Sequence, residues 1–348
     1  MKTSNRGERV RSARLIAGLT QKELATVAGL SQALVSQVES GLRIATDDTV
    51  QAVGRAVGMP QSFFDIQTQN IPDGTMRFRK LASSRITETR RVEELAREAW
   101  RVWSSLMRDA QYPKPSLPSR PTNEDFDLEA VAGAARRALG LDVDRPIGHL
   151  TRTLESHGIA VIRMGGATDP EQLGHFGVSC WPSPIDYGII AVFPGSGDRE
   201  RFTVAHELGH FILHRNFEDV DGAELEAHRF AGAFLLPASR MEEAIGGGVT
   251  LSDLARLKAR WGVSMQAIIM RGAELGLIDP ARKTGLFRQL SARGWRKDEP
   301  VEVHNEQPML TWELLRRSFG ARPYLKASES LGMNELLLRS WAAPPSAA

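Results

Sequence analysis

Two histidines four residues apart, with a glutamate between them, stand in the stretch RFTVAHELGH, residues 201–210. On a helix, His206 and His210 lie on one face about one turn apart, the spacing that two imidazole ligands of a tetrahedral zinc ion need. Glu207 lies beside them, where a carboxylate can accept a proton from an attacking water. A helix that carries two solvated or core-packed histidines has the same pattern, so a third ligand is needed to decide.

The third ligand is expected on a following helix, and the stretch DGAELEAHRFAGAFLLP, residues 221–237, offers three candidates. Glu224 and His228 share a helix face at i and i+4, whereas Glu226 points elsewhere. Helical geometry therefore favours Glu224 as the ligand, with His228 one turn on. His228 then orients a ligand through its ring or, as the less favoured alternative, replaces Glu224.

Other residues near these segments carry weaker signals. His214 follows His210 by four residues, so it is either a fourth metal neighbour or, as we favour, a hydrogen-bonded histidine at the helix end. Tyr187 and His228 are candidates for the group that steadies an oxyanion, and either can be purely structural. Cys180 is interpreted as a small buried hydrophobe. His175 has no companion motif.

The segments around the histidine pair predict an α+β domain. Helices are expected over 127–140 and 147–158, and strands over 159–164 and 188–194, because the latter are rich in β-branched residues. The strand GIIAVFP at 188–194 is expected to be an edge strand that pairs with an extended substrate. Segment 249–278 is expected to be helical and to pack on this domain, with a second DNA-binding surface as the alternative. Helices are also expected over 311–319 and 334–341.

The stretches RFTVAHELGHFILH and ELEAHRFAGAFLLP resemble the ImmA/IrrE family of zinc metallopeptidases, over about residues 125–300. The resemblance implies that His206, His210 and Glu224 bind Zn²⁺ and that Glu207 is the general base of peptide hydrolysis. It also implies a zincin-like fold and a regulatory protein, such as a transcriptional repressor, as the substrate. The chain departs from the family pattern at His228, where asparagine or aspartate is usual.

The first 65 residues predict a bundle of four short helices. Gly18 ends the first helix, and Thr20 with Glu23 three residues later forms a capping box for the second. Ser31 and Thr46 are expected to cap the third and fourth helices. Two short helices joined by a glycine turn are typical of a helix-turn-helix, although a purely structural bundle has the same pattern.

Polar side chains lie on the outer face of the third helix. Gln32, Ser36 and Gln37 can donate to and accept from base edges in a DNA groove. Gln21, at the start of the second helix, and Arg43 are placed to hold phosphates. These residues make double-stranded DNA, in the form of an operator, a candidate partner of this segment, with a purely structural bundle as the alternative.

The stretches LTQKELA and GLSQALVSQVESG, followed by the helix at 46–57, resemble the XRE (lambda-repressor-like) family of helix-turn-helix domains. The resemblance implies that DNA contacts fall on this set of residues: Gln21, Gln32, Ala33, Ser36 and Gln37. A homodimer is also expected, because paired half-sites match two-fold protein symmetry.

Residues 77–108 are expected to form a basic helix, with nine Lys or Arg against four Glu. Its apolar side, with Leu95, Trp103 and Leu106, is expected to pack on a neighbour or on a dimer mate, and its charge is a secondary aid to DNA binding. The prolines in QYPKPSLPSRP predict a stiff connector. The expected domains are 1–68 (helix-turn-helix), 69–120 (basic helix and linker), 121–245 (zinc peptidase) and 246–348 (helical region).

The helical segments described above predict a mainly α multidomain protein, and the composition is that of a globular protein. The 348 residues are 42% hydrophobic and 25% charged, as in ordinary globular proteins, and the net charge of +2 places any basic surface locally. A lone cysteine, an N-terminus without a signal-peptide pattern and short apolar runs predict a cytoplasmic protein without membrane spans.

Two functions from different classes remain open at this point. In the first, a DNA-binding regulator carries a zinc endopeptidase that cleaves a repressor or similar regulatory protein, or itself, in response to a signal. In the second, the peptidase-like domain cuts nothing and serves as a sensor of metal, peptide or small ligand. A third possibility, that the first domain binds protein instead of DNA, predicts binding without salt dependence.

Overall fold

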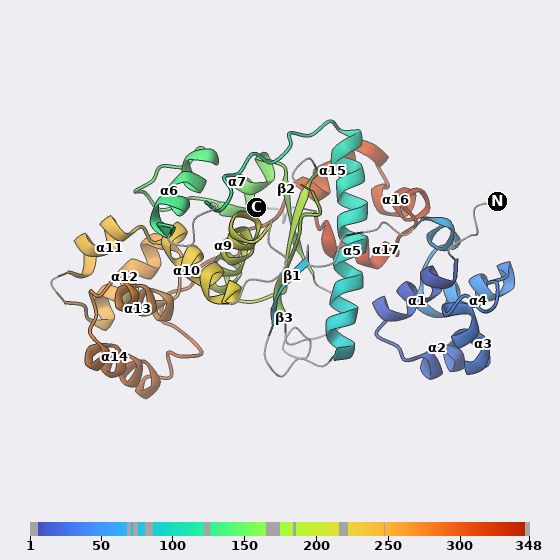
Figure 1. Cartoon of the computed structure of the whole chain (residues 1–348), viewed down its shortest axis with the longest axis horizontal. Helices are drawn as coiled ribbons and strands as arrows, with labels where there is room; N and C mark the ends of the chain where they lie inside the picture. The colour runs from blue at the N-terminus through green and yellow to red at the C-terminus, as the bar shows by residue number, and fades with distance from the viewer. Residues whose placement is uncertain are drawn as a thin grey trace.

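The computed structural model describes residues 6–67, 71, 76–80, 86–121, 126–164, 175–183, 186–215, 222–246 and 248–344. It is mainly helical, with a four-stranded sheet in the middle of the molecule (Figure 1). The helix-turn-helix segment lies at one end, and helices α12 (Leu251–Trp261), α13 (Met265–Glu274) and α14 (Pro280–Ala292) lie at the other. The mainly α, multidomain fold class expected from the sequence is confirmed.

The second, third and fourth N-terminal helices begin where their capping residues predict. They are α1 (Arg6–Ile16), α2 (Gln21–Ala28), α3 (Gln32–Glu39) and α4 (Asp47–Val57), followed by a 3₁₀ turn η1 (Gln61–Asp65). Thr20 accepts from the Glu23 N–H while the Glu23 carboxylate accepts from the Thr20 N–H, which completes the capping box. Ser31 and Thr46 cap α3 and α4 with their hydroxyls.

The basic segment is not one continuous helix. Met76–Lys80 forms strand β1, and the helix α5 spans Ile86–Asp109, so the helix predicted from residue 77 is wrong over its first residues. Sheet pairing with β3 competes successfully with helical propensity in the stretch MRFRK. Leu95, Trp103 and Leu106 are buried within this chain, and α5 contacts α1, β3 and β4. The apolar side of α5 therefore packs inside the protomer.

The sheet has the strand order β1-β3-β4-β2, with β2 (Ile159–Arg163), β3 (His175–Cys180) and β4 (Gly188–Val192). Strand β2 pairs with β4 in parallel, and β3 is antiparallel to both β4 and β1. The prediction that 188–194 is an edge strand is wrong, because β4 lies between β3 and β2. Its five buried residues explain this, since a strand covered on both faces is typically interior.

Alternate residues of the strands enter two separate cores. On β2, Ala160 and Ile162 join the core that also contains α5 and the helix-turn-helix, while Ile159 and Val161 join the core of the opposite face. That second core includes residues of the helices α6 (Leu128–Ala138), α7 (Leu150–Ser156), α9 (Gly197–Leu213), α10 (Ala223–Leu235) and α11 (Ala238–Ile245). Helix α5 thus covers one face of the sheet and α9 the other (Figure 1).

The C-terminal helices connect the sheet to the helix-turn-helix. They are α15 (Leu310–Phe319), α16 (Pro323–Leu331) and α17 (Glu335–Trp341), and they share the core of α5, whereas α12 to α14 share the core of α9. The Ser62 hydroxyl donates to the Glu329 carbonyl, and the Asn334 amide donates to the Gly58 carbonyl. The region 246–348 therefore divides between the two cores. No helix in the described ranges is long and apolar enough to cross a membrane.

Candidate metal centre and DNA interface

The candidate ligands meet where α9 passes α10. The Nε2 atoms of His206 and His210 lie 3.2 Å apart. Glu224 Oε2 is 3.4 Å from His206 Nε2, and Glu224 Oε1 is 3.3 Å from His210 Nε2. Among the described residues, these three form a group whose ligand atoms can share one metal ion, which is the set expected from the sequence.

The group has the dimensions that zinc requires. Bonds of about 2.0–2.1 Å in tetrahedral geometry place neighbouring ligand atoms roughly 3.3 Å apart. The three distances match that value, and two imidazoles with one carboxylate leave a fourth position for water or substrate. Both histidine side chains are buried, whereas 61% of the Glu224 side chain is exposed. The group therefore opens to solvent on the α10 side.

The electrostatics favour a charged carboxylate at this position. Partial burial raises the pKa of Glu224, but the hydrogen bonds and charges of His206 and His210 outweigh burial and lower that pKa well below its usual range. A carboxylate that is ionised at neutral pH, facing two imidazole nitrogens, is a donor set for a divalent cation. The residues present thus fit a zinc ion.

Close helix packing holds the ligands together. A side chain on Gly209 would place its Cβ 3.0 Å from the Phe230 ring and 3.3 Å from the backbone of Ala227. Glycine at this position lets α9 and α10 approach each other. The approach brings Glu224 on the first turn of α10 within reach of both histidines on α9.

Glu207 lies against strand β3 and is fully buried. The Ser179 hydroxyl donates a hydrogen bond of 2.6 Å to Glu207 Oε2. A Cβ on Gly177 would stand 2.9 Å from Glu207 Oε1, so only glycine leaves room for this carboxylate beside the strand. Neither Gly177 nor Ser179 was expected, because strand β3 itself was not predicted.

Further contacts extend from His210 away from the candidate metal. His210 Nδ1 is 2.9 Å from His214 Nδ1, and His214 Nε2 is 3.1 Å from Glu226 Oε2. Arg120 of the proline-rich connector donates to the same Glu226 oxygen at 2.8 Å. His214 is therefore a hydrogen-bonded histidine at the end of α9, as favoured from the sequence. Glu226 does not face the candidate metal, as expected, but it contacts His214.

The outer face of α3 presents the residues expected to touch DNA. Gln32, Ala33, Ser36 and Gln37 are all exposed, and Arg43 is exposed in the loop after α3. Val35 and Val38 are buried on the other side of the same helix. Helix α3 is the second helix of the helix-turn-helix, and an amphipathic helix in this position can enter the major groove of DNA.

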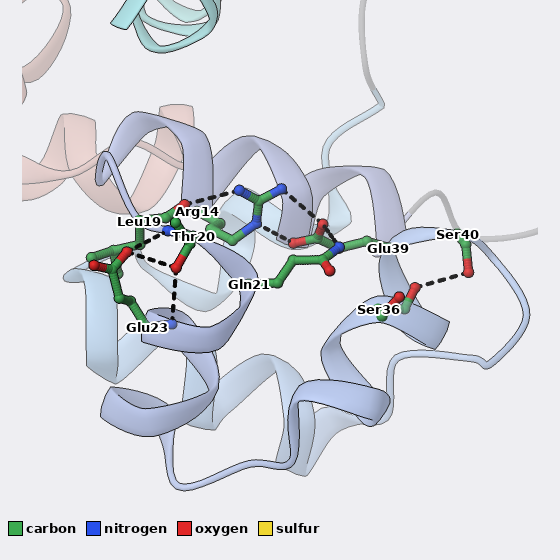
Figure 2. A network of polar contacts seen from close by, with 8 residues as sticks. All are labelled: Arg14, Leu19, Thr20, Gln21, Glu23, Ser36, Glu39 and Ser40. Carbon is green, nitrogen blue, oxygen red and sulfur yellow. Dashed lines mark hydrogen bonds and ion pairs between the residues drawn. The ribbon is translucent and has the colours of Figure 1, made fainter. Parts of the chain in front are cut away.

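A hydrogen-bonded network fixes the start of α2 beside α3 (Figure 2). Arg14 donates two hydrogen bonds to the Glu39 carboxylate, at 2.6 and 2.9 Å, and a third to the Leu19 carbonyl. Gln21 Nε2 also donates to Glu39 Oε2, at 2.9 Å. The Gln21 amide, expected to hold a phosphate, is thus oriented by the C-terminal residue of α3.

Comparison with known protein families finds a match in each of the two regions. Residues 10–60 match the family model described as helix-turn-helix, and residues 155–271 match the model of the IrrE N-terminal-like domain, a family of peptidases. The chain joins an XRE-type helix-turn-helix to an IrrE-like domain. The match to the IrrE-like domain spans α9 and α10 and so includes all three candidate ligands.

Other comparisons add little to this assignment. No curated protein sequence matches the chain. A crystal structure of Bacillus thuringiensis PlcR in complex with the peptide PapR7 and DNA aligns with 12% identity over 86% of this chain and all of that one. Its TM-score of 0.17 is too low to support an argument about fold.

Within the IrrE-like domain, the remaining candidates have other contacts. The His228 ring lies against Phe202, with centroids 4.9 Å apart. The Tyr187 hydroxyl donates to the Tyr112 carbonyl, and Tyr187 packs in the core of α5. Cys180 is buried, and burial raises the pKa of its thiol, which agrees with a packing role. The side chain of His175 lies outside the described part of the chain.

Proposed function

We propose that this chain is a DNA-binding transcriptional regulator whose IrrE-like domain is a zinc-dependent endopeptidase. The observation that carries the proposal is the triangle of His206, His210 and Glu224, with sides of 3.2, 3.3 and 3.4 Å. The substrate proposed is a regulatory protein, either a partner repressor or this chain itself.

The proposed chemistry is hydrolysis of a peptide bond. Zn²⁺ held by the two histidines and Glu224 would act as a Lewis acid at the scissile carbonyl. Glu207 accepts a proton from the attacking water and transfers it to the leaving amine. The hydroxyl of Ser179 holds one oxygen of the Glu207 carboxylate and so orients the proposed base.

Access to this site is proposed to run along the sheet edge. Strand β3 contacts Glu207, and the strand beyond β3 is β1 of the same chain. An extended peptide that pairs with β3 would have to take the place of β1. The proposal therefore includes an activating step in which β1 leaves the edge.

The test uses the substitution Glu207→Gln, which keeps the volume of the side chain and removes the base. In cells, the wild-type protein and the variant are compared for accumulation of cleaved regulator and for transcription of the controlled genes. The proposal expects equal zinc content, no cleavage by the variant and a changed transcriptional response. An unchanged response would show that hydrolysis is not the output.

The DNA-binding part of the proposal rests on the exposed face of α3. Selection from a random pool of duplexes should enrich a palindromic site bound by a dimer, with an affinity that falls steeply as salt rises. Gln37→Ala should relax base preference, while Val27→Ala, on an exposed residue of α2, is the control. A monomer on the selected site would contradict the expected dimer.

One observation favours a second candidate function, a sensor that cuts nothing. Glu207 is fully buried and the edge beside β3 is filled by β1, so in the described chain neither the proposed base nor this edge of β3 is open to a substrate. In that function zinc or a bound peptide shifts DNA affinity without turnover. DNA affinity that responds to zinc equally in wild type and Glu207→Gln would favour the sensor.

A further inference from the structure

The contacts behind His210 form an unbroken line of polar side chains. His214 comes from the end of α9, Glu226 from the first turn of α10, and Arg120 from the connector that follows α5. We propose that His214, Glu226 and Arg120 are positioning residues that fix the tautomer and the ring orientation of the metal ligand His210. This inference rests on the proposed zinc site.

The direction of the hydrogen bonds follows from the chemistry of imidazole. A neutral imidazole carries one N–H, so a ring that offers Nε2 to a metal must carry its proton on Nδ1. His210 Nδ1 therefore donates to His214 Nδ1, 2.9 Å away. His214 must then carry its own proton on Nε2, which donates to Glu226 Oε2 at 3.1 Å. Each of these two hydrogen bonds then has one donor and one acceptor.

Burial shields the two histidine rings of this line from water. The side chain of His214 is fully buried, and that of His210 is 1% exposed, so water does not compete for the bond between the rings. Glu226 is 27% exposed, and Arg120, 14% exposed, supplies the opposite charge. Arg120 thus holds the Glu226 carboxylate beside the His214 ring, and Glu226 in turn holds the ring that contacts His210.

Arg120 ties this line to the rest of the chain. Its backbone N–H donates to the Ile212 carbonyl of α9 at 2.9 Å, and its guanidinium lies over the Phe126 ring. The connector that leads from α5 is therefore fixed to the same helix that carries His210. A change in the conformation of the connector would therefore alter the contacts that orient His210.

The experiment measures zinc affinity of the purified full chain by competition with a chromogenic chelator. His214→Phe keeps a ring in the buried space and removes both nitrogens, so affinity should fall on the order of 10- to 100-fold. His214→Gln retains an acceptor and a donor and should recover part of the loss. Glu226→Gln should lower affinity by a smaller factor. His304→Phe, on a 92% exposed ring, and Glu243→Gln, on a 69% exposed carboxyl, are matched controls.

A second measurement reads the tautomer directly. With ¹⁵N-labelled histidine, long-range proton–nitrogen spectra of the zinc-loaded wild type should show His210 and His214 in opposite tautomers, with protons on Nδ1 and Nε2 respectively. In Glu226→Gln, the His214 signals should shift while those of His157 stay. A His214 ring with its proton on Nδ1 in the wild type would overturn the inference.

The outcomes separate this inference from the proposed function. A wild type that takes up no zinc overturns both. Zinc affinity that is equal in the wild type, His214→Phe and Glu226→Gln overturns the positioning role and leaves the zinc site intact. DNA binding and the thermal unfolding midpoint show whether each variant folds. If His214→Phe does not fold, the zinc affinity of Glu226→Gln tests the positioning role.

Discussion

The hydroxyl of Ser179 lies 2.6 Å from Glu207 Oε2, although the two residues come from different elements, β3 and α9. This contact places a strand residue against the expected base of a zinc peptidase. It holds the carboxylate in one orientation while the neighbouring histidines face Glu224. Strand β3 thus shapes the site as much as the helix that carries the histidines.

Ser179→Ala should lower the rate of cleavage about tenfold and leave zinc content unchanged. The reason is the loss of a hydrogen bond to a charged acceptor, worth about 1.5–3 kcal/mol, part of which is recovered by relaxation. Ser156→Ala, at a hydroxyl that donates to the Thr153 carbonyl away from the site, is the control. Cleavage by Ser179→Ala at the wild-type rate would show that the contact does not orient the base.

Replacing the β1 residues 76–80 by a Gly-Ser segment of equal length should increase cleavage of the regulatory substrate. The physical reason is that β1 fills the edge beside β3, where an extended substrate would pair. Cleavage is measured by mass spectrometry, with Glu207→Gln in the same background as the blank. Reduced cleavage with intact folding would mean that β1 builds the site and does not cover it.

Glu98→Gln should destabilise the folded protein by about 3–5 kcal/mol, since it leaves buried arginine charges without a counter-ion. The Glu98 carboxylate pairs with Arg9 of α1 and with Arg101 of α5, and Arg101 also donates to the Leu331 carbonyl of α16. Burial raises the pKa of Glu98, but Arg101 and Arg9 lower it below its usual range.

Urea unfolding monitored by tryptophan fluorescence measures that effect. Glu243→Gln breaks an exposed pair with Arg240 and should change stability far less than Glu98→Gln, because solvent screens an exposed ion pair. A loss of similar size in both variants would contradict the structural role given to Glu98 between the helix-turn-helix and the C-terminal helices.

Glu155 should make stability fall as pH rises from about 4.3 to 7. Burial raises the pKa of this carboxyl to about 7, and the N–H groups of Met309 and Leu310 only partly oppose burial. Because the folded-state pKa lies above the unfolded value, this group stabilises the fold at low pH, and that contribution, up to roughly 3 kcal/mol, is lost as pH rises through 7.

The thermal unfolding midpoint as a function of pH measures the Glu155 effect. Glu155→Gln cannot ionise but keeps an acceptor for the Met309 N–H. The unfolding midpoint should therefore fall less steeply between pH 5 and 7, by an amount that corresponds to about one bound proton. Glu302→Gln, on a side chain that is 84% exposed, should leave the slope unchanged. An unchanged slope in Glu155→Gln would show that Glu155 does not titrate in this range.

Local signals in the sequence were sufficient for the helix-turn-helix and for the three candidate ligands. Caps such as Thr20 and Ser31 act over three residues, and the spacing of His206 and His210 needs only one helix. Glu224 could be chosen because the face it shares with His228 is set by the same helical period.

Non-local contacts were not predictable in this way. Strand β3 lacks the usual alternation because Gly177 must make room for Glu207. The stretch at 76–80 is basic like the helix that follows, and only pairing with β3 makes it a strand. The link from Arg120 through Glu226 to His214 joins three elements, and nothing in the local sequence marks it.

The most direct test of the account is the metal content of the gently purified full chain, measured by elemental mass spectrometry. We predict one zinc ion per chain in the wild type and in Glu207→Gln, and its loss in His206→Ala, because His206 supplies one corner of the ligand triangle. The absence of metal from the wild type even after zinc is offered would contradict the zinc site and, with it, the proposed peptidase.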